Sequence, residues 1–403
     1  MAYLQGIKVI DLGRSVSGPY ACQILADLGA EVVKVVPPGR GMPDDGSDGP
    51  GAWRALDDGK TVVALNLEDE TGTAALAGLL RRADVLIESF RPGRLDSLGF
   101  GVDRLRELNR GLVHVALTGW GLTGPYRDRT GEDINYMAFG GALAHAGTGP
   151  LPGFPYPPTA EFAAGRQAAL AAVAALFDRS RRGPAAYGAT IDVAVADAVL
   201  AWQAVPLAEA LAGRPPERRR ERLNGGAACY QIYRTADGRF LSVGALDRDA
   251  WAAFCAAVAR PDWVPRHADP LPQKDLIAEV GDLLRSAPLA DWQVRLAGVD
   301  CCVEPLWTLD ELPDHPHVVA RGLVRTGGPP ARAEVALPMI VDGAPPPPRA
   351  PIRFAAAEAV LAAWGGTEPG EAAGEPGDAE RGGGETRTGG GRRRRREQDT
   401  GNG

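Results

Sequence analysis

The chain has 403 residues, of which 45% are hydrophobic and 24% are charged, a balance typical of a soluble globular protein with room for two domains. Its net charge of -7 argues against a nucleic-acid partner, which usually requires a basic face. The acidic balance does not exclude an anionic ligand, because a local cluster of arginines can bind one inside an acidic protein.

The sequence also argues against a membrane-spanning, secreted or metal-binding protein. No stretch reaches the roughly 18 to 20 apolar residues of a membrane span, and the longest candidate, 163–177, is interrupted by Arg166 and Gln167. The N-terminus lacks the pattern of a signal peptide. The five scattered cysteines lack metal-ligand spacing, so we expect reduced thiols, no metal site and a cytoplasmic location.

Short β-rich runs alternate with segments of helical spacing near the N-terminus. The β-rich runs lie at 7–12, 31–36, 61–67, 84–88 and 111–117. The first run ends in turn residues at 13–18, and the helix that follows, 19–28, stops at Gly29. Strands separated by helices predict βαβ units and a mostly parallel sheet.

A long Gly- and Pro-rich stretch at 122–158 follows, with a short helix expected around 133–143. Loops of this length in compact enzymes are commonly functional. The next segments predict an Ala-rich helix at 162–177, a strand at 189–193 and one long helix at 191–211.

The pattern changes at residue 223. Runs at 229–234 and 240–243 flank the dipeptide Asp237-Gly238, which predicts a β-hairpin. Two helical segments follow before residue 330 and indicate a second, smaller domain.

We therefore predict an α/β fold with two domains and a tail. Its parts are a Rossmann-like large domain with a mostly parallel sheet at 1–222, a smaller α+β domain at 223–332, a return segment to the large domain at 333–364 and a Gly-, Glu- and Arg-rich tail at 365–403. The tail lacks the apolar content that a core requires, so we expect it to be disordered.

Familiar nucleotide, metal and hydrolase motifs are absent from the sequence. The turn at 13–18 stands between a strand and a helix, but its two glycines lack the dinucleotide-binding spacing. Backbone N–H groups at that helix start remain candidates for holding an anion. His315-Pro316-His317 indicates a surface turn, because proline restricts the geometry and acidic residues surround the pair.

Four carboxylates stand beside Gly- and Pro-rich turns. Glu132 and Asp133 lie at a loop-to-helix junction, where the helix dipole favours their ionised forms. Glu161 lies just before the Ala-rich helix, and Asp247 follows an apolar strand. Taken singly, each is more often a helix N-cap than a catalytic residue, so residue type alone leaves both roles open.

Five blocks of sequence resemble the family III CoA-transferase superfamily and occur in that family's order. They are LQGIKVIDLGRSVSGPYACQILADLGAEVVK (4–34), ADVLIESFRPGRLDSLGFG (83–101), LTGWGLTGPYRDRTGEDINYMAFGG (117–141), LNGGAACYQIYRTADGRFLSVGALD (223–247) and DCCVEPLWTLDELPDHPHVVARGLV (300–324). The block at 223–247 looks most like the α-methylacyl-CoA racemase branch. The resemblance covers roughly residues 4–364 and leaves only the tail outside.

The resemblance implies an enzyme acting on an acyl-CoA thioester, with no cofactor beyond the coenzyme A of its substrate. It also implies an interlocked homodimer, in which each chain forms a ring threaded by the other and the thioester lies between the large domain of one subunit and the small domain of its partner. By position, Val16, Arg40 and Arg91 would border the CoA, whose phosphates suit paired guanidinium donors. An internal salt bridge is the alternative role for Arg91.

The chain departs from the family at its catalytic positions. The racemases carry His where Glu132 stands, Asp where Glu161 stands and Glu where Asp247 stands. Their Asp in a Leu-Asp-Gly-Gly segment is Asn224 here, whereas Asp133 retains the family's residue. Three of the changed positions still carry a carboxylate, so the resemblance leaves the reaction open.

Three functions are compatible with this pattern. In the first, Glu132 and Glu161 flank the α-carbon of a 2-methylacyl-CoA or related thioester and exchange its proton through an enolate. In the second, Glu161 is the nucleophile of a CoA-transferase, and a glutamyl-CoA thioester passes CoA to another carboxylic acid. In the third, the protein binds an acyl-CoA without turning it over. Another proton-transfer reaction, such as dehydration, is a variant, and the sequence does not name the acyl group.

Overall fold

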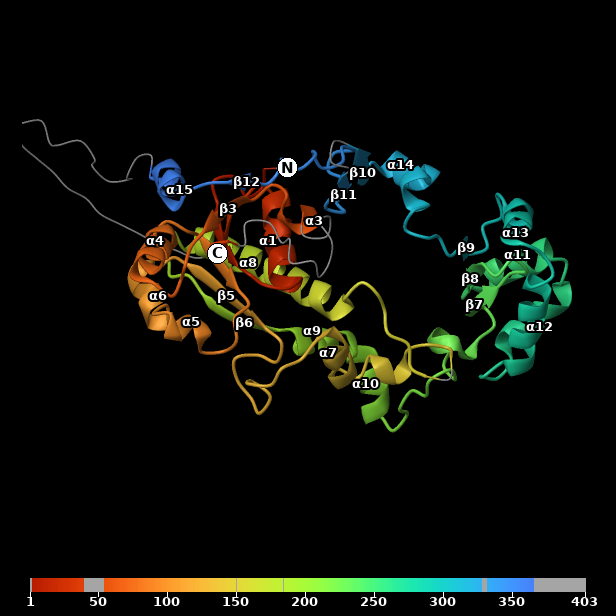
Figure 1. The fold of residues 1–403 in the computed structure, drawn as a ribbon. Coiled ribbons are helices and arrows are strands. Elements are labelled where there is room, and N and C mark those ends of the chain that lie inside the picture. Colours follow the sequence, from red (N-terminus) through yellow and green to blue (C-terminus); the bar gives the residue numbers. More distant parts are fainter. Residues whose placement is uncertain (1, 40–53, 150, 184, 328–331, 366–403) are drawn as a thin grey trace, which may run out of the picture. The chain divides into compact units, whose positions relative to one another are not determined.

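The computed structural model describes residues 2–39, 54–149, 151–183, 185–327 and 332–365, which form an α/β fold (Figure 1). Arg40, which the resemblance places beside the CoA, lies outside the described residues. Residues 366–403 of the predicted disordered tail also lie outside them.

A seven-stranded parallel sheet forms the centre of the large domain. Its strands, in spatial order, are β12 (Arg353–Phe354), β3 (Thr61–Ala64), β2 (Glu31–Val36), β1 (Lys8–Leu12), β4 (Val85–Glu88), β5 (Val113–Thr118) and β6 (Thr190–Ala194). Val9 of β1 pairs with Val32 of β2 and with Val85 of β4, so the sheet grows outward from β1 in both directions. The α/β class and the parallel sheet predicted from the sequence are therefore confirmed.

Helices cover both faces of this sheet. Val9 and Ile10 are neighbours on β1 and completely buried, but they belong to separate apolar clusters because successive side chains of a strand point to opposite faces. The Val9 face packs against α1 (Ser17–Asp27), α8 (Thr159–Arg182) and α9 (Val195–Trp202). The Ile10 face packs against α4 (Glu70–Leu80), α5 (Arg94–Ser97), α6 (Val102–Leu108) and α15 (Ala357–Trp364).

Helix α8 is longer than the predicted segment 162–177. By length and composition it is able to cross a membrane, which corrects the expectation that no segment is; a core helix of a soluble protein passes the same test. Ala164, Ala168 and Ala172 are completely buried in the apolar cluster that α8 shares with α1, and the two helices lie side by side (Figure 1). Helix α8 is thus part of the core of the large domain.

The single helix predicted over 191–211 is two helices, α9 and α10 (Ala204–Leu211), separated at Gln203. Pro206 occupies the third position of α10. In a continuous helix its ring would clash with the carbonyl group four residues earlier, and it has no N–H group to donate. The proline therefore explains the break.

A separate apolar cluster forms the core of the smaller domain. It is built from β7 (Tyr230–Arg234), β8 (Phe240–Gly244), β9 (Val303–Pro305), α11 (Arg248–Ala257), α12 (Lys274–Leu284) and α13 (Leu289–Leu296). Gly238 has a φ of 81°, the left-handed conformation that favours glycine in a tight turn, and the predicted hairpin is present. Other elements are α3 (Arg54–Asp57), α7 (Asp133–Phe139), α14 (Pro316–Arg321), β10 (Val324–Gly327) and β11 (Arg332–Val335). The domain boundaries stay a prediction.

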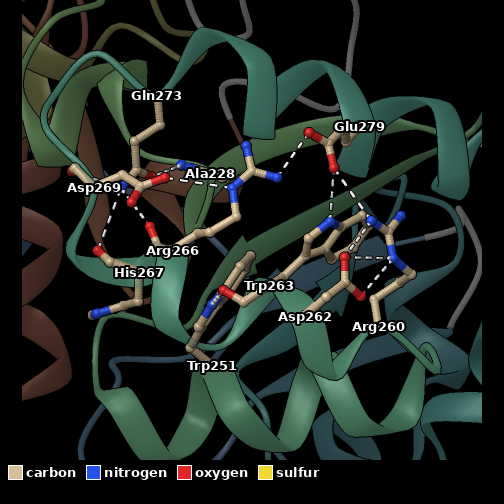
Figure 2. Close-up of polar contacts among 10 residues, drawn as sticks. All are labelled: Ala228, Trp251, Arg260, Asp262, Trp263, Arg266, His267, Asp269, Gln273 and Glu279. Atoms are coloured by element: carbon tan, nitrogen blue, oxygen red, sulfur yellow. Dashed lines mark hydrogen bonds and ion pairs between the residues drawn. The ribbon is translucent and has the colours of Figure 1, made fainter.

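A polar network joins α12 to the turns that precede it (Figure 2). Glu279 accepts hydrogen bonds from Arg266 at 2.7 Å and from the Trp263 indole at 2.9 Å. A third bond, from Arg260, is 3.2 Å long. Gln273 is buried just before α12, and its amide nitrogen donates to three backbone carbonyl oxygens of the preceding turn. These partners satisfy the buried carboxamide and fix the turns against the helix.

Lys60 is completely buried and joins three segments of the large domain. Its ammonium group donates to Asp11 Oδ2 of β1 at 2.9 Å, to Asp57 Oδ1 of α3 at 3.0 Å and to the Pro19 carbonyl oxygen of α1 at 2.9 Å. Burial alone would lower the pKa of Lys60, but the charges of Asp11 and Asp57 outweigh it and raise this pKa. Burial alone would raise the pKa of Asp57, but Lys60 and Lys34 outweigh it and lower this pKa.

Replacing Lys60 with Met should lower the free energy of unfolding by about 3–5 kcal/mol, because it leaves the Asp11 carboxylate buried without its cation. Urea denaturation followed by circular dichroism measures the change. The control Lys274→Met removes an exposed lysine at the start of α12 and should change stability by about 0.5 kcal/mol or less. Equal effects of the two substitutions would contradict the role assigned to Lys60.

Candidate active site

A cavity of about 390 Å³ is lined by segments that follow four neighbouring strands of the sheet. The lining includes Ser15 and Ser17 after β1, Arg91 after β4, Trp120 after β5 and Val195 after β6. The chain leaves the adjacent strands β1 and β4 toward opposite edges of the sheet, so their carboxyl ends form a topological switch point. Ligands of α/β proteins bind in the crevice at such a point, which makes this cavity the candidate active site.

The turn between β1 and α1 forms one wall of the cavity. A Cβ on Gly13 would lie 2.7 Å from the Cα of Gly18, so the two ends of the turn approach too closely for a side chain. Asp11 Oδ1 accepts a hydrogen bond from the Gly13 N–H at 2.8 Å, and Ser89 Oγ accepts one from the Arg14 N–H at 2.6 Å. The turn is therefore fixed both to β1 and to the loop after β4.

Glu161 lies in the first turn of α8, but its side chain reaches the turn after β1. Its Oε2 accepts a hydrogen bond from the Ser17 N–H at 3.0 Å, and its Oε1 accepts one from the Ser15 hydroxyl at 3.2 Å. A Cβ at Gly165 would lie only 2.5 Å from the Ser17 carbonyl oxygen, so glycine is what lets α8 come this close. Glu161 is 9% exposed and lines the cavity instead of capping its own helix, whose N-cap is Pro158.

Glu132 and Asp133 differ in what they contact at the start of α7. Glu132 is the N-cap residue; its N–H donates to Asn135 Oδ1 at 3.0 Å, and its exposed side chain lines the cavity. Asp133 Oδ1 accepts a hydrogen bond from the backbone N–H of Glu161 at 3.0 Å. Asp133 thus joins the starts of α7 and α8 and fixes the backbone of Glu161 relative to that of Glu132.

Tyr136 of α7 is almost completely buried beside these carboxylates. Its hydroxyl donates to the Gly131 carbonyl oxygen at 2.7 Å, and a Cβ on Gly119 would lie 2.1 Å from that hydroxyl. Burial, followed by the negative charges of the neighbouring carboxylates with Glu161 first, raises the pKa of Tyr136 to about 12. The phenol therefore stays protonated near neutral pH and holds the backbone just before Glu132.

Arginine side chains also line the cavity: Arg14, Arg91, Arg127 and Arg129. Arg14 stacks over the Phe90 ring at 5.0 Å. Arg91 is exposed and forms no ion pair within the part of the chain that the structure describes. Guanidinium groups bind phosphates through paired donors, so these residues suit an anionic ligand. Val16, the N-cap of α1, is not among the lining residues, although both of its neighbours are.

Asp247 is not brought to this cavity within the chain. It occupies the exposed N-cap position of α11 in the smaller domain, where its side chain forms no capping hydrogen bond. The His315 and His317 pair also lies elsewhere, and His315 Nδ1 accepts a hydrogen bond from the His317 N–H at 3.2 Å. Over the described ranges, no group of three His, Cys, Asp or Glu residues is placed to hold a metal ion.

The structure adds Ser15, Ser17, Tyr136 and the arginines at 14, 127 and 129 to the residues named from the sequence. A signal for the two serines was present in the sequence, because they occupy the turn between the first predicted strand and its helix. Nothing in the sequence pattern showed that Tyr136 would pack beside both glutamates.

Comparisons with known proteins identify relatives over most of the chain. A model of the family described as CoA-transferase family III matches residues 4–352. Human alpha-methylacyl-CoA racemase is 34% identical over 329 residues, which cover 79% of this chain and 81% of the racemase. Succinyl-CoA--D-citramalate CoA-transferase of Chloroflexus aurantiacus is 33% identical over 338 residues, which cover 79% of this chain and 82% of the transferase. A CAIB/BAIF family protein from Brucella suis has a crystal structure that matches with a TM-score of 0.74 at 26% identity, covering 90% of this chain and 99% of that one.

The chain therefore belongs to CoA-transferase family III. Relatives in this family are enzymes, and an isomerase or transferase activity fits the chain. The resemblance inferred from the five sequence blocks is confirmed, including the similarity to the racemases. At these identities the choice between racemisation and CoA transfer rests on the site itself.

The raised pKa of Tyr136 predicts a difference in stability at high pH. Between about pH 10, where an unfolded tyrosine ionises, and about pH 12 the folded protein keeps this proton and the unfolded chain loses it. The contribution of Tyr136 to the free energy of unfolding therefore falls as the pH rises through that window. Replacing Tyr136 with Phe should lower the free energy of unfolding by about 1 kcal/mol near pH 8, because the hydrogen bond to the Gly131 carbonyl oxygen is lost. Near pH 11 the same replacement should lower it by less.

Urea denaturation of both proteins at the two pH values measures this difference. Tyr3→Phe is the control, because Tyr3 is 62% exposed and its replacement should leave the pH dependence of stability unchanged. A stability gap between wild type and Tyr136→Phe that is the same at both pH values would show that Tyr136 ionises normally.

Proposed function

We propose that this protein is an acyl-CoA racemase or epimerase acting on the α-carbon of a 2-methylacyl-CoA or a related thioester. One observation carries the proposal: Glu132 and Glu161, from two different helices, line one cavity at the switch point of the sheet. Inversion at a carbon needs one group that removes a proton and another that returns one to the opposite face. Two carboxyl groups can catalyse inversion in both directions if one is protonated and the other is ionised.

The proposed reaction proceeds in two proton transfers. The carboxylate of one glutamate removes the α-proton, and the electron pair of the C–H bond moves into the thioester to form an enolate. The protonated carboxyl of the other glutamate then returns a proton to the opposite face. The developing oxyanion requires preorganised donors, for which backbone N–H groups at a helix start are suited. The sequence of steps is redox-neutral and needs no cofactor beyond the CoA of the substrate.

The surroundings of the glutamates support this assignment. Glu161 is fixed by Ser15, Ser17 and the contact of its backbone with Asp133, whereas Glu132 is exposed at the start of α7. Glu161 is buried and Glu132 is exposed, so the two carboxyl groups line one cavity from different surroundings. Arginines 14, 91 and 127 lie along the same cavity and would bind the phosphates of the CoA.

The interlocked homodimer stays part of the proposal. Asp247 lies outside the cavity of its own chain, in the smaller domain. In the dimer that the family resemblance implies, Asp247 of the partner subunit would approach the site. A cytoplasmic location, away from nucleic acid and membrane, is proposed with it.

CoA transfer is the second candidate, supported by the 33% identity to the Chloroflexus aurantiacus transferase. In that reaction a Glu161 carboxylate oxygen would attack the thioester carbonyl and release CoA as the thiolate, giving a mixed anhydride. The thiolate would then attack the glutamyl carbonyl, releasing the acyl group as its carboxylate and leaving a glutamyl-CoA thioester. Glu161 accepts one hydrogen bond on each oxygen, and each carboxylate oxygen keeps a second lone pair, so these contacts allow attack on the thioester as well as proton abstraction.

The proposal predicts that wild-type protein in deuterated water exchanges the α-proton of both enantiomers of a 2-methylacyl-CoA and interconverts them. Mass spectrometry measures deuterium, and chiral chromatography of the hydrolysed acid measures inversion. Buffer containing the substrate alone is the control. Binding of the thioester without exchange from either enantiomer would eliminate the two-base function and favour the non-catalytic alternative.

The transferase alternative is tested by trapping. Incubation with acyl-CoA and hydroxylamine should leave Glu161 unmodified if it acts only as a proton-transfer group, because no glutamyl thioester forms. Peptide mass spectrometry of the digested protein is the measurement. A hydroxamate at Glu161 that depends on acyl-CoA would instead identify Glu161 as a nucleophile.

A further inference from the structure

Ser15 has an unusual backbone conformation at the edge of the candidate active site. Its φ is +59°, in the left-handed region that residues other than glycine seldom occupy. Ser15 lines the cavity, and its hydroxyl donates to Glu161 Oε1 at 3.2 Å. Strained backbone of this kind persists where the surrounding structure imposes it, and it is concentrated at functional sites.

The neighbouring contacts leave Ser15 little freedom to relax. On one side, the Gly13 N–H is bound by Asp11 and the Arg14 N–H is bound by Ser89. On the other side, α1 starts at once, and its Pro19 carbonyl accepts a hydrogen bond from the buried Lys60. The turn is closed by these contacts and by the Gly13–Gly18 approach, so the conformation of Ser15 is set by the scaffold.

The conformation has a consequence for Glu161. Glutamate has one more rotatable side-chain bond than aspartate, so a single donor leaves its carboxylate free to turn. Here each oxygen has its own donor: the Ser17 N–H for Oε2 and the Ser15 hydroxyl for Oε1. The backbone donor would survive any change of side chain at 17, whereas the Ser15 donor depends on that one residue.

We propose that Ser15 is a positioning residue for Glu161: its strained turn conformation directs the hydroxyl to Oε1 and holds the longer glutamate carboxylate in one orientation in the cavity. The inference rests on the proposed proton-transfer function for its effect on rate, but the orientation itself is independent of that function. A displacement of a reacting group by about 1 Å can cost roughly a hundredfold in rate, so loss of this contact acts on kcat.

The test uses Ser15→Gly and Ser15→Ala in the full-length protein. Glycine removes the hydroxyl and accepts the left-handed conformation without strain, so the turn is retained. Alanine removes the hydroxyl and keeps the strain. Ser286→Ala is the control, because the Ser286 hydroxyl only donates to a backbone carbonyl within the smaller domain.

Both Ser15 variants should lose roughly ten- to a hundredfold in kcat for α-proton exchange, while KM changes by less than about twofold, because the hydroxyl is engaged with Glu161 Oε1. Thermal unfolding should place the midpoint of Ser15→Gly above that of Ser15→Ala, because both lose the hydroxyl and only glycine relieves the strain. Wild-type kcat in Ser15→Gly would overturn the inference whatever Ser15→Ala shows, because Ser15→Gly lacks the hydroxyl.

Crystal structures of wild type and Ser15→Gly separate this inference from the proposed function. The Glu161 carboxylate should turn away from its wild-type position in the variant whether or not the wild type exchanges α-protons. An unmoved carboxylate in Ser15→Gly would overturn the positioning role. Failure of wild type to exchange, with a displaced carboxylate in the variant, would overturn the proposed function and leave the positioning role supported.

Discussion

The buried ammonium group of Lys60 makes three contacts, to Asp11 on β1, to Asp57 on α3 and to the Pro19 carbonyl on α1. Asp11 uses its other carboxylate oxygen for the Gly13 N–H at the start of the next turn. Removing one partner of a buried ion pair leaves an uncompensated charge, so loss of Lys60 would leave Asp11 buried without its cation. The shape of the turn, and with it the position of Ser15, depends on charges that never reach solvent.

Close packing of the backbone then determines where the two glutamates lie relative to this turn. Gly165 lets α8 approach the Ser17 carbonyl, which brings Glu161 to the donors of the turn. Asp133 binds the backbone of Glu161 and thereby relates α8 to the helix that begins beside Glu132. A site made of carboxylates can be held in this way without a histidine, because backbone and hydroxyl donors orient the acids.

Much of the fold was predictable because local patterns determine it. Alternating strands and helices predicted the parallel sheet, and Asp237-Gly238 predicted the hairpin. The break at Gln203 was missed because an apolar pattern continues through Pro206, although proline cannot. Glu132, Asp133 and Glu161 were named from the sequence, and the structure brings them together. The hydrogen bond from the Ser15 hydroxyl to Glu161 and the burial of Tyr136 depend on packing between distant segments, which no local sequence pattern predicts.

The central claim is that Glu132 and Glu161 serve as separate bases on opposite faces of one α-carbon. The most direct measurement is α-proton exchange in deuterated water by Glu132→Gln and Glu161→Gln, each with the R and the S enantiomer of a 2-methylacyl-CoA. We predict that each variant loses racemisation by at least about a hundredfold and retains exchange with one enantiomer only, opposite for the two variants. Exchange of both enantiomers by either variant, or unchanged racemisation, would contradict the claim.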